Sequence, residues 1–198
     1  MDDLAQRLSH DLDGTFEDLV RCHQDRLYSI ALRLTGHPSD AEEVAQDAFV
    51  RAYRALATYE RDRIRAMELR AWLATIVVNL CRNKARARKA PTVSLDGEPG
   101  TTIEVADVRE GTPGDHAERR ESNAYWAGLV AGLPERYRTA VVLRHVDGLG
   151  YAEMAGALGR PEGTLKAQVH RGLMLLRAAH DASGRDPQAA ARNQEVLR

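Results

Sequence analysis

The polar side chains with the most specific chemistry lie in the segment 133–177. Its last part is expected to place charged and amide groups on the outer surface of a helix that begins near Pro161: Glu162, Lys166, Gln168, His170 and Arg171. Lysine and arginine can neutralise phosphate groups, and the amide of Gln168 has the geometry to pair with an adenine edge. A solvated polar face on an ordinary helical hairpin has the same pattern. The residue types alone leave both interpretations open.

Three predicted helices position these side chains. The first begins at Leu133-Pro134-Glu135-Arg136 and ends at the breaker Asp147-Gly148. A short second helix, Tyr151–Leu158, is followed by Gly159, which can adopt positive φ. The third helix is expected to bury one apolar face, formed by Leu165, Val169, Leu173 and Leu176. Two short helices around a tight glycine turn, the second with a basic outer face, are typical of a helix-turn-helix.

Carboxylates and histidines elsewhere do not form a catalytic set. Glu42, Glu43 and Asp47 are candidate paired carboxylates, but the adjacent Glu42 and Glu43 point about 100° apart on a helix, so these two do not share one site. His145 and His170 have no orienting partner in the pattern, and neither a glycine-rich phosphate loop nor a nucleophile motif accompanies them. The sequence therefore predicts that the chain is not an enzyme and uses no cofactor.

Composition indicates an all-α protein with unevenly distributed charge. The 198 residues are 43% hydrophobic but only 5% aromatic, and β-branched runs are scarce. The formal net charge is −1, yet residues 61–90 are strongly basic and residues 91–121 are acidic. Such blocks predict a local basic surface next to an acidic, poorly folded segment.

Cysteine use and hydropathy bear on the compartment. Cys22 and Cys81 form no CxxC motif and no metal-ligand spacing, so no metal site is expected. Buried free thiols in a reducing cytoplasm are the favoured interpretation, with a regulatory disulfide as the alternative. The amino terminus has no apolar signal region, and no run of about eighteen apolar residues exists. These features predict a cytoplasmic protein without stable membrane insertion.

The segment 133–177 resembles a known DNA-reading domain. The stretches Leu133–Arg138, Val141–Arg144, Gly148–Ala155, Gly163–Lys166 and His170-Arg171 are similar, in order and spacing, to the promoter-reading carboxy-terminal domain of bacterial sigma factors, above all the extracytoplasmic-function group. Ala167-Gln168 departs from the family's usual Ser-Arg. The resemblance implies that seven residues contact the duplex −35 element: Arg160, Glu162, Thr164, Lys166, Gln168, His170 and Arg171.

A second segment, 40–53, is similar to the core-polymerase-binding helix of the same family. Thr15 with Asp18, and Ser39 with Glu42, have capping-box spacing and predict two helix starts, the second helix running to about Leu56. A solvated mixed face is the alternative to a binding surface on the second helix. The resemblance implies that five of its residues face a coiled coil on the largest polymerase subunit: Glu43, Gln46, Asp47, Val50 and Arg51.

A third segment, 69–83, resembles the sigma-factor domain that opens promoters. A helix from Leu69 has a continuous apolar stripe and then turns basic, and Trp72 is interpreted as a core residue rather than a base-stacking one. The preceding loop, about 59–65, would hold a base flipped from the non-template strand. The resemblance implies eight contacts to the melted −10 element: Tyr59, Arg61, Arg63, Arg65, Asn79, Arg82, Asn83 and Arg86.

The expected architecture is all-α: two small helical domains joined by a flexible acidic linker, the carboxy-terminal one a helix-turn-helix. The expected boundaries are an acidic segment 1–14, sigma region 2 at 15–90, a linker at 91–114, sigma region 4 at 115–180 and a disordered tail at 181–198. By resemblance the linker threads through polymerase, whereas a bare tether is the alternative.

The resemblance implies an alternative sigma factor that is monomeric when free. Its expected partners are core RNA polymerase, promoter DNA and an anti-sigma factor. Two rivals remain open at this point. A one-component helix-turn-helix regulator would bind operators by itself, as a dimer on half-sites about one helical turn apart. A protein-binding helical adaptor would not need the basic residues at 82–89.

Overall fold

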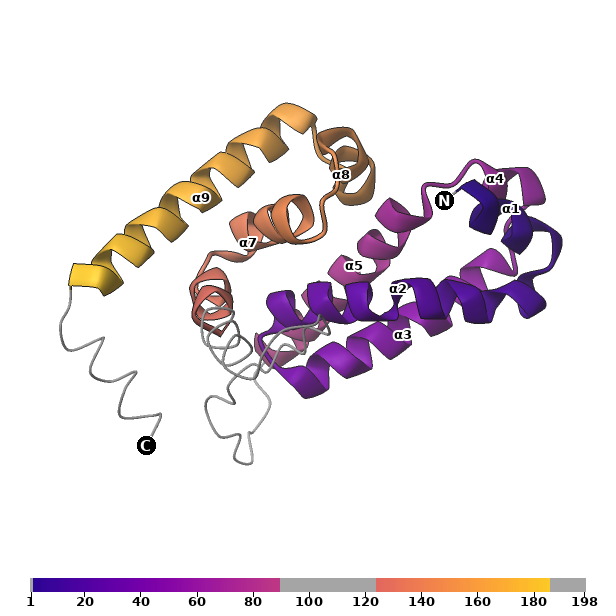
Figure 1. Ribbon diagram of the computed structural model, residues 1–198, viewed down its shortest axis with the longest axis horizontal. Helices are drawn as coiled ribbons and strands as arrows, with labels where there is room; N and C mark the ends of the chain where they lie inside the picture. The colour runs from indigo at the N-terminus through magenta and orange to yellow at the C-terminus, as the bar shows by residue number, and fades with distance from the viewer. Residues whose placement is uncertain (1, 90–123, 186–198) are drawn as a thin grey trace, which may run out of the picture.

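The computed structural model describes residues 2–89 and 124–185, and every regular element in these two stretches is a helix (Figure 1). The N-terminal part, residues 2–89, contains α1 (Asp2–His10), α2 (Leu12–Thr35), α3 (Pro38–Leu56), α4 (Arg61–Arg65) and α5 (Leu69–Lys89). The C-terminal part, residues 124–185, contains a helix at 124–131, α7 (Glu135–Val141), the π-helical turn η1 (Val142–Val146), α8 (Tyr151–Leu158) and α9 (Glu162–Arg185). The all-α prediction is confirmed.

The start of α2 corrects the prediction of a capping box at Thr15. The cap is Asp11, whose carboxylate accepts a hydrogen bond from the Gly14 amide at 3.0 Å, so Thr15 lies inside the helix and is buried. The preceding α1 packs against α2 and α4 and buries Leu8. Helix α1 therefore belongs to the folded core of the N-terminal part.

The start of α3 corrects the second capping box. His37 is the capping residue without a side-chain hydrogen bond, and Pro38 occupies the first helical turn, where its fixed φ suits the helix. Ser39 therefore lies within the first turn. The expected end near Leu56 is confirmed, and the helix buries small side chains, including Ala41, Ala48 and Ala52, against its neighbours.

The charged segment after α3 is partly helical, because it contains the short helix α4 with a buried Ile64. The helix expected from Leu69 is confirmed as α5, and it buries Leu73 and Val77 completely. Trp72 is half-buried and packs against the core, with its ring 6.2 Å from the ring of Tyr59. This environment supports the interpretation of Trp72 as a core residue.

The first helix of the C-terminal part does not continue in α-helical register to the breaker. After Val141 the chain forms η1, and the Asp147 amide donates to the Val142 carbonyl at 3.0 Å, an i→i+5 bond. This wider turn leaves Val146 40% exposed and turns Asp147 inward. The helix expected to run to Asp147-Gly148 is therefore α-helical only as far as Val141.

The helix-turn-helix forms as expected, with one correction on its second helix. The bounds of α8 are those predicted, and Gly159 has φ of 62°. On α9, Leu165, Val169 and Leu176 are buried, but Leu173 is 41% exposed, so its expected place in the core is wrong. Gly172 faces inward instead, where an added Cβ would lie 2.5 Å from a methyl group of Val141.

The two parts pack against each other in one arrangement (Figure 1). Helix α5 lies beside α8, and α2 contacts both η1 and α7, so buried residues of both parts form one continuous apolar cluster. The expected linker at 91–114 lies outside the described residues, as do residues 115–123 at the beginning of the expected region 4. Helix α9 extends to Arg185, so residues 181–185 of the expected tail are helical, and the remainder lies outside the described residues.

Candidate nucleic-acid and protein interfaces

One face of α3 presents all five residues predicted to contact polymerase. Glu43, Gln46, Asp47, Val50 and Arg51 are exposed, while the opposite face of the helix is buried. The exposed fraction of Val50 is 47%, which places an apolar side chain within a polar strip. An apolar centre with a polar rim is the usual composition of a protein-binding surface.

Ion pairs connect this face to the basic end of α5. Lys84 forms ion pairs with Glu43 and with Asp40, the latter at 3.1 Å, and Arg88 lies 2.5 Å from the Asp40 carboxylate. Partial burial lowers the pKa of Lys84, but the hydrogen bonds to Glu43 and Asp40 outweigh this effect, so the pKa is raised above its ordinary value. Acidic side chains of α3 therefore neutralise part of the basic tract that was expected to bind DNA. This pairing could not be predicted from the sequence, because α3 and the basic end of α5 are about forty residues apart.

The segment before α5 builds a small aromatic and basic site. The Arg63 guanidinium lies 3.6 Å from the centre of the Tyr59 ring, and Trp72 lies on the α5 side of that ring. Arg61 is exposed nearby on α4. An aromatic ring covered by a guanidinium is a surface on which an unstacked base can stack once the arginine moves to a phosphate.

Arg65, also predicted to bind DNA, is held by α1. Its Nε donates to the Ser9 hydroxyl at 3.1 Å, an Nη lies 3.1 Å from Nε2 of His10, and the other Nη lies 3.3 Å from the Asp62 carboxylate. These contacts give Arg65 a role in joining α1 to α4. Sequence reasoning missed the role because the two segments are more than fifty residues apart.

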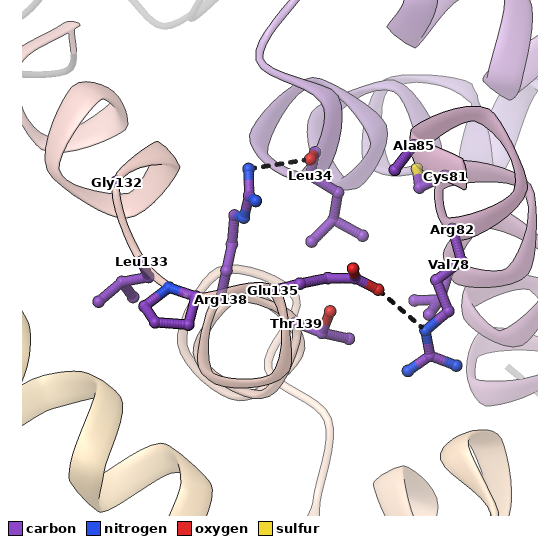
Figure 2. A pocket seen from close by; sticks show the side chains of 11 residues that line it. Leu34, Val78, Cys81, Arg82, Ala85, Gly132, Leu133, Glu135, Arg138 and Thr139 are labelled. Carbon is purple, nitrogen blue, oxygen red and sulfur yellow. Dashed lines mark hydrogen bonds and ion pairs between the residues drawn. The ribbon is translucent and has the colours of Figure 1, made fainter. Parts of the chain in front are cut away.

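The predicted −10 residues on α5 divide into two groups. Asn79, Asn83 and Arg86 are exposed at helical spacing and share one face. Arg82 instead points toward the C-terminal part, where its Nε lies 3.6 Å from the Glu135 carboxylate (Figure 2). Burial and the nearby Arg160 charge lower the pKa of Arg82, although Glu135 opposes them.

The second helix of the helix-turn-helix presents most of its predicted −35 residues to solvent. Glu162, Thr164, Lys166, His170 and Arg171 are exposed. Gln168 is half-buried, and its side-chain oxygen accepts a hydrogen bond from Arg160 at 3.2 Å. The Gln168 amide is therefore partly engaged within the protein. Lys166 lies 3.7 Å from Glu162 and 5.5 Å from the centre of the Tyr151 ring.

A cavity of about 380 Å³ lies where the two parts of the chain meet (Figure 2). Its walls include Leu34 and Cys81 from the N-terminal part and Glu135 and Arg138 from the C-terminal part. Burial raises the pKa of the Cys81 thiol to about 12. Cys22 is exposed, which corrects the prediction that both thiols are buried, and both cysteines are free.

Within residues 2–89 and 124–185, no group of three His, Cys, Asp or Glu side chains is arranged to hold a metal ion. Among the helices of the same two stretches, none combines the length and apolar character needed to cross a membrane.

Two family models match the chain, Sigma-70 region 2 over residues 19–90 and Sigma-70, region 4 over residues 125–176. The ECF RNA polymerase sigma factor SigW of Bacillus subtilis (strain 168) is 33% identical over 167 residues, which are 82% of this chain and 87% of that protein. The chain belongs to the extracytoplasmic-function sigma factors. The ECF RNA polymerase sigma-E factor of Escherichia coli (strain K12) is 30% identical to this sigma factor over 173 residues, 85% and 87% of the two chains.

Solved structures agree with this membership. CnrH, determined in complex with the cytosolic domain of CnrY, superposes with a TM-score of 0.65 at 25% identity, over 91% of this chain and 97% of that one. The sigma factor RpoE of Bartonella quintana gives a TM-score of 0.59 at 20% identity, over 82% and 94%, and supports the fold alone. The chain is therefore an alternative sigma factor that directs transcription, and the one-component regulator is not favoured. The individual contact residues stay predictions.

Proposed function

We propose that this sigma factor docks on core RNA polymerase through the exposed face of α3. The observation that carries the proposal is the strip formed by Gln46, Asp47, Val50 and Arg51, whose side chains are exposed on a helix that buries its other face. A regulator that binds DNA by itself does not need this surface. Polymerase supplies the chemistry, and the sigma factor supplies promoter choice.

We further propose that DNA is read in two places. Lys166, His170 and Arg171 on α9 contact duplex −35 DNA, where the exposed side chains of Lys166 and Arg171 neutralise phosphates. Asn79, Asn83 and Arg86 on α5 face melted −10 DNA, and the Tyr59 ring receives an unstacked base after Arg63 moves aside. The proposed domains are regions 2 and 4, expected at 15–90 and 115–180.

An anti-sigma factor is proposed as a further partner, because the Bartonella quintana sigma factor with a similar fold was determined in complex with the anti-sigma factor NepR. The proposed site of action is the cytoplasm, where core polymerase and promoter DNA are found together. We propose that the free chain is a monomer. A sigma factor needs no twofold partner, because one chain reads both promoter elements.

The decisive experiment measures binding of the labelled full chain to core polymerase and, separately, to random-sequence and genomic duplex DNA. The proposal predicts tight binding to core and specific DNA binding only after core is added. Asp47→Arg should remove core binding, whereas Asp181→Arg, an exposed site on α9, should leave it unchanged. Specific duplex binding by the free chain, with none to core, would instead support the one-component regulator.

A further inference from the structure

Helix α4 is a short element that borders the proposed −10 site. It has five residues, of which Ile64 is buried and the other four have exposed, charged side chains. So short a helix is not stable by itself in water, because it has too few internal hydrogen bonds to offset the cost of nucleation. Contacts with the rest of the chain therefore hold α4 in place.

The position of α4 determines what a base meets at the Tyr59 ring. Arg63 lies on α4, and its guanidinium is 3.6 Å from the centre of that ring. Trp72 on α5 bounds the same ring, with 6.2 Å between the ring centres. Tyr59 and Trp72 pack against the core, whereas Arg63 is exposed. We call these three residues the stacking site; a shift of α4 moves one of its walls and leaves the others in place.

Arg65, at the end of α4, connects this helix to α1, which lies beside it (Figure 1). Its Nε donates to the Ser9 hydroxyl at 3.1 Å, and one Nη lies 3.1 Å from Nε2 of His10. Ser9 is buried, and its hydroxyl in turn donates to the Gln6 carbonyl at 2.6 Å. Arg65 is therefore tied to the backbone of α1 through a buried hydroxyl that both donates and accepts.

The contact between Arg65 and His10 has a defined direction. A guanidinium has only N–H donors, so Nε2 of His10 accepts, and the proton of the neutral ring lies on Nδ1. A side chain at position 10 keeps this contact only if it offers an acceptor to Arg65. Glutamine offers one, whereas lysine offers none and repels the guanidinium. Substitutions at this position therefore distinguish the hydrogen bond from the mere presence of a polar side chain.

The guanidinium of Arg65 is engaged within the chain at all three of its nitrogens. Two contact Ser9 and His10, and the third lies 3.3 Å from the Asp62 carboxylate. A DNA phosphate would have to compete with these partners. The arrangement favours an indirect effect of Arg65 on DNA, exerted through the placement of α4.

We propose that Arg65 is a positioning residue that ties α4 to Ser9 and His10 of α1. Held in this way, α4 fixes Arg63 at the stacking site and determines which base of the melted −10 strand is preferred there. This inference rests on the proposed function, because the melted strand reaches the site only in the complex with polymerase. Helix α1 thus contributes to promoter choice without contacting DNA.

The hold of α1 on α4 is measured in the free full chain by amide hydrogen exchange. The amides of Ile64 and Ala66 donate to the carbonyls of Glu60 and Asp62, each at 3.1 Å. Their exchange therefore reports local opening of α4. This readout needs neither polymerase nor DNA.

Two variants remove the connection, and a third is the matched control. Arg65→Gln and Ser9→Ala should each speed exchange of the α4 amides about fivefold, the effect of losing one hydrogen bond. Arg21→Gln makes the same charge change at an exposed arginine of α2 that pairs with Glu17, and it should leave this exchange unchanged. Arg65 is 42% exposed, so its replacement should leave the rest of the chain folded.

Base preference is measured with the complex of the full chain and core polymerase. The probes are non-template-strand oligonucleotides with a −10 element selected from genomic fragments by this complex, each base being replaced in turn. Tyr59→Ala identifies the position that the stacking site reads, because the preference there should disappear. Affinity for core polymerase should stay at the wild-type value in every variant, which excludes a general loss of structure.

At that position, the ratio of affinities for the selected base and for its replacements is the decisive quantity. The ratio should fall about fivefold in Arg65→Gln and in Ser9→Ala, within the range of a single base mismatch. His10→Lys should lower it similarly, whereas His10→Gln should keep the wild-type ratio. A wild-type ratio in His10→Lys, or an equal loss in both His10 variants, would overturn the assigned contact.

A double variant separates positioning from direct contact with DNA. If Ser9 and Arg65 form one connection, Ser9→Ala combined with Arg65→Gln should lower the ratio no further than Arg65→Gln alone. A phosphate contact predicts instead that Arg65→Gln weakens all oligonucleotides equally and reduces the slope of log affinity against log salt by about 0.7. In that case Ser9→Ala would change neither quantity, and the positioning role would be overturned.

Failure of the positioning role and failure of the proposed function give different results. Unchanged exchange of the α4 amides in Arg65→Gln would overturn the hold of α1 on α4, and faster exchange with unchanged base preference would overturn its role in promoter choice. A wild-type complex without any −10 base preference would refute the proposed function together with that role. Exchange in the free chain that Arg65→Gln accelerates would still support the hold of α1 on α4.

Discussion

Replacing Lys166 by alanine tests whether α9 reads DNA through phosphate contacts. The Lys166 side chain is 58% exposed and lies 3.7 Å from Glu162 in an i,i+4 ion pair. An exposed pair of this kind contributes only about 0.3–0.5 kcal/mol, and alanine is the best helix former, so the helix should remain folded. Any change in DNA binding then reports the lost cation.

The size of the effect follows from counterion release. Each phosphate contact contributes about 0.9 to the slope of log affinity against log salt. Between about 50 and 200 mM salt, a fourfold range, the wild type should lose roughly 3.5-fold more affinity than Lys166→Ala, because the wild type releases one more counterion. Lys166→Arg should keep the wild-type slope.

A −35 duplex is first selected from genomic fragments by the chain bound to core polymerase. The assay then measures binding of the same complex to this duplex by fluorescence anisotropy over a salt series. Arg177→Ala, an exposed arginine farther along α9, is the matched control and should keep the wild-type slope. If Lys166→Ala and Arg177→Ala both behave like the wild type, Lys166 does not contact a phosphate. An equal loss in both variants would indicate non-specific attraction by α9.

Three further outcomes are expected. Asp47→Arg should weaken binding to core polymerase by at least about thirtyfold, because it reverses a charge at the docking surface. Its helicity, measured by circular dichroism, should be unchanged. Wild-type affinity for core would show that this face of α3 does not bind polymerase. Gly172→Ala should lower the free energy of unfolding in urea by about 1–3 kcal/mol, because the added methyl group overlaps Val141. Gly156→Ala has open space around the added methyl group and should raise the free energy of unfolding by about 0.5–1 kcal/mol. Equal effects of the two variants would refute the close contact between Gly172 and Val141. Burial, together with the positive charges of Arg26 and Arg70, lowers the pKa of His23 in the folded chain. The stabilising contribution of neutral His23 is therefore complete above pH 6.5 and is lost as the pH falls from 6.5 toward the folded-state pKa. The urea midpoints measured at about pH 7.5 and about pH 5.5 should differ less in His23→Leu than in the wild type.

The features predicted correctly from the sequence are those determined by local chemistry. The bounds of α8 follow from the glycines on either side, and Gly159 has the positive φ that its position requires. The exposed strip on α3 follows from helical periodicity, because the residues between its polar positions are small and apolar. The two helix starts are exceptions, because Asp11 and Pro38, rather than Thr15 and Ser39, mark the beginnings of α2 and α3.

The other errors arose where a residue far away in the sequence determines the local structure. Leu173 matched the apolar spacing of α9, but the close approach of Val141 places Gly172 inward and leaves Leu173 exposed. The π-helical turn changes the helical register before Asp147. The Asp147 carboxylate pairs with Arg26 and Arg70, which are more than seventy residues away in the sequence. Arg65 and Arg82 were assigned to −10 DNA by resemblance, which does not reveal Ser9 or Glu135 as their partners within the chain, and the assignment to DNA stays a prediction.

In the proposed function, this chain gives core polymerase the ability to open a specific promoter. The most direct measurement is permanganate reactivity of thymines in genomic promoter fragments incubated with core alone, with the chain alone, or with both. Reactive thymines at a −10 element are expected only when both proteins are present, and Asp47→Arg should abolish them. Protection of duplex DNA by the chain alone, with no strand opening after core is added, would contradict this function.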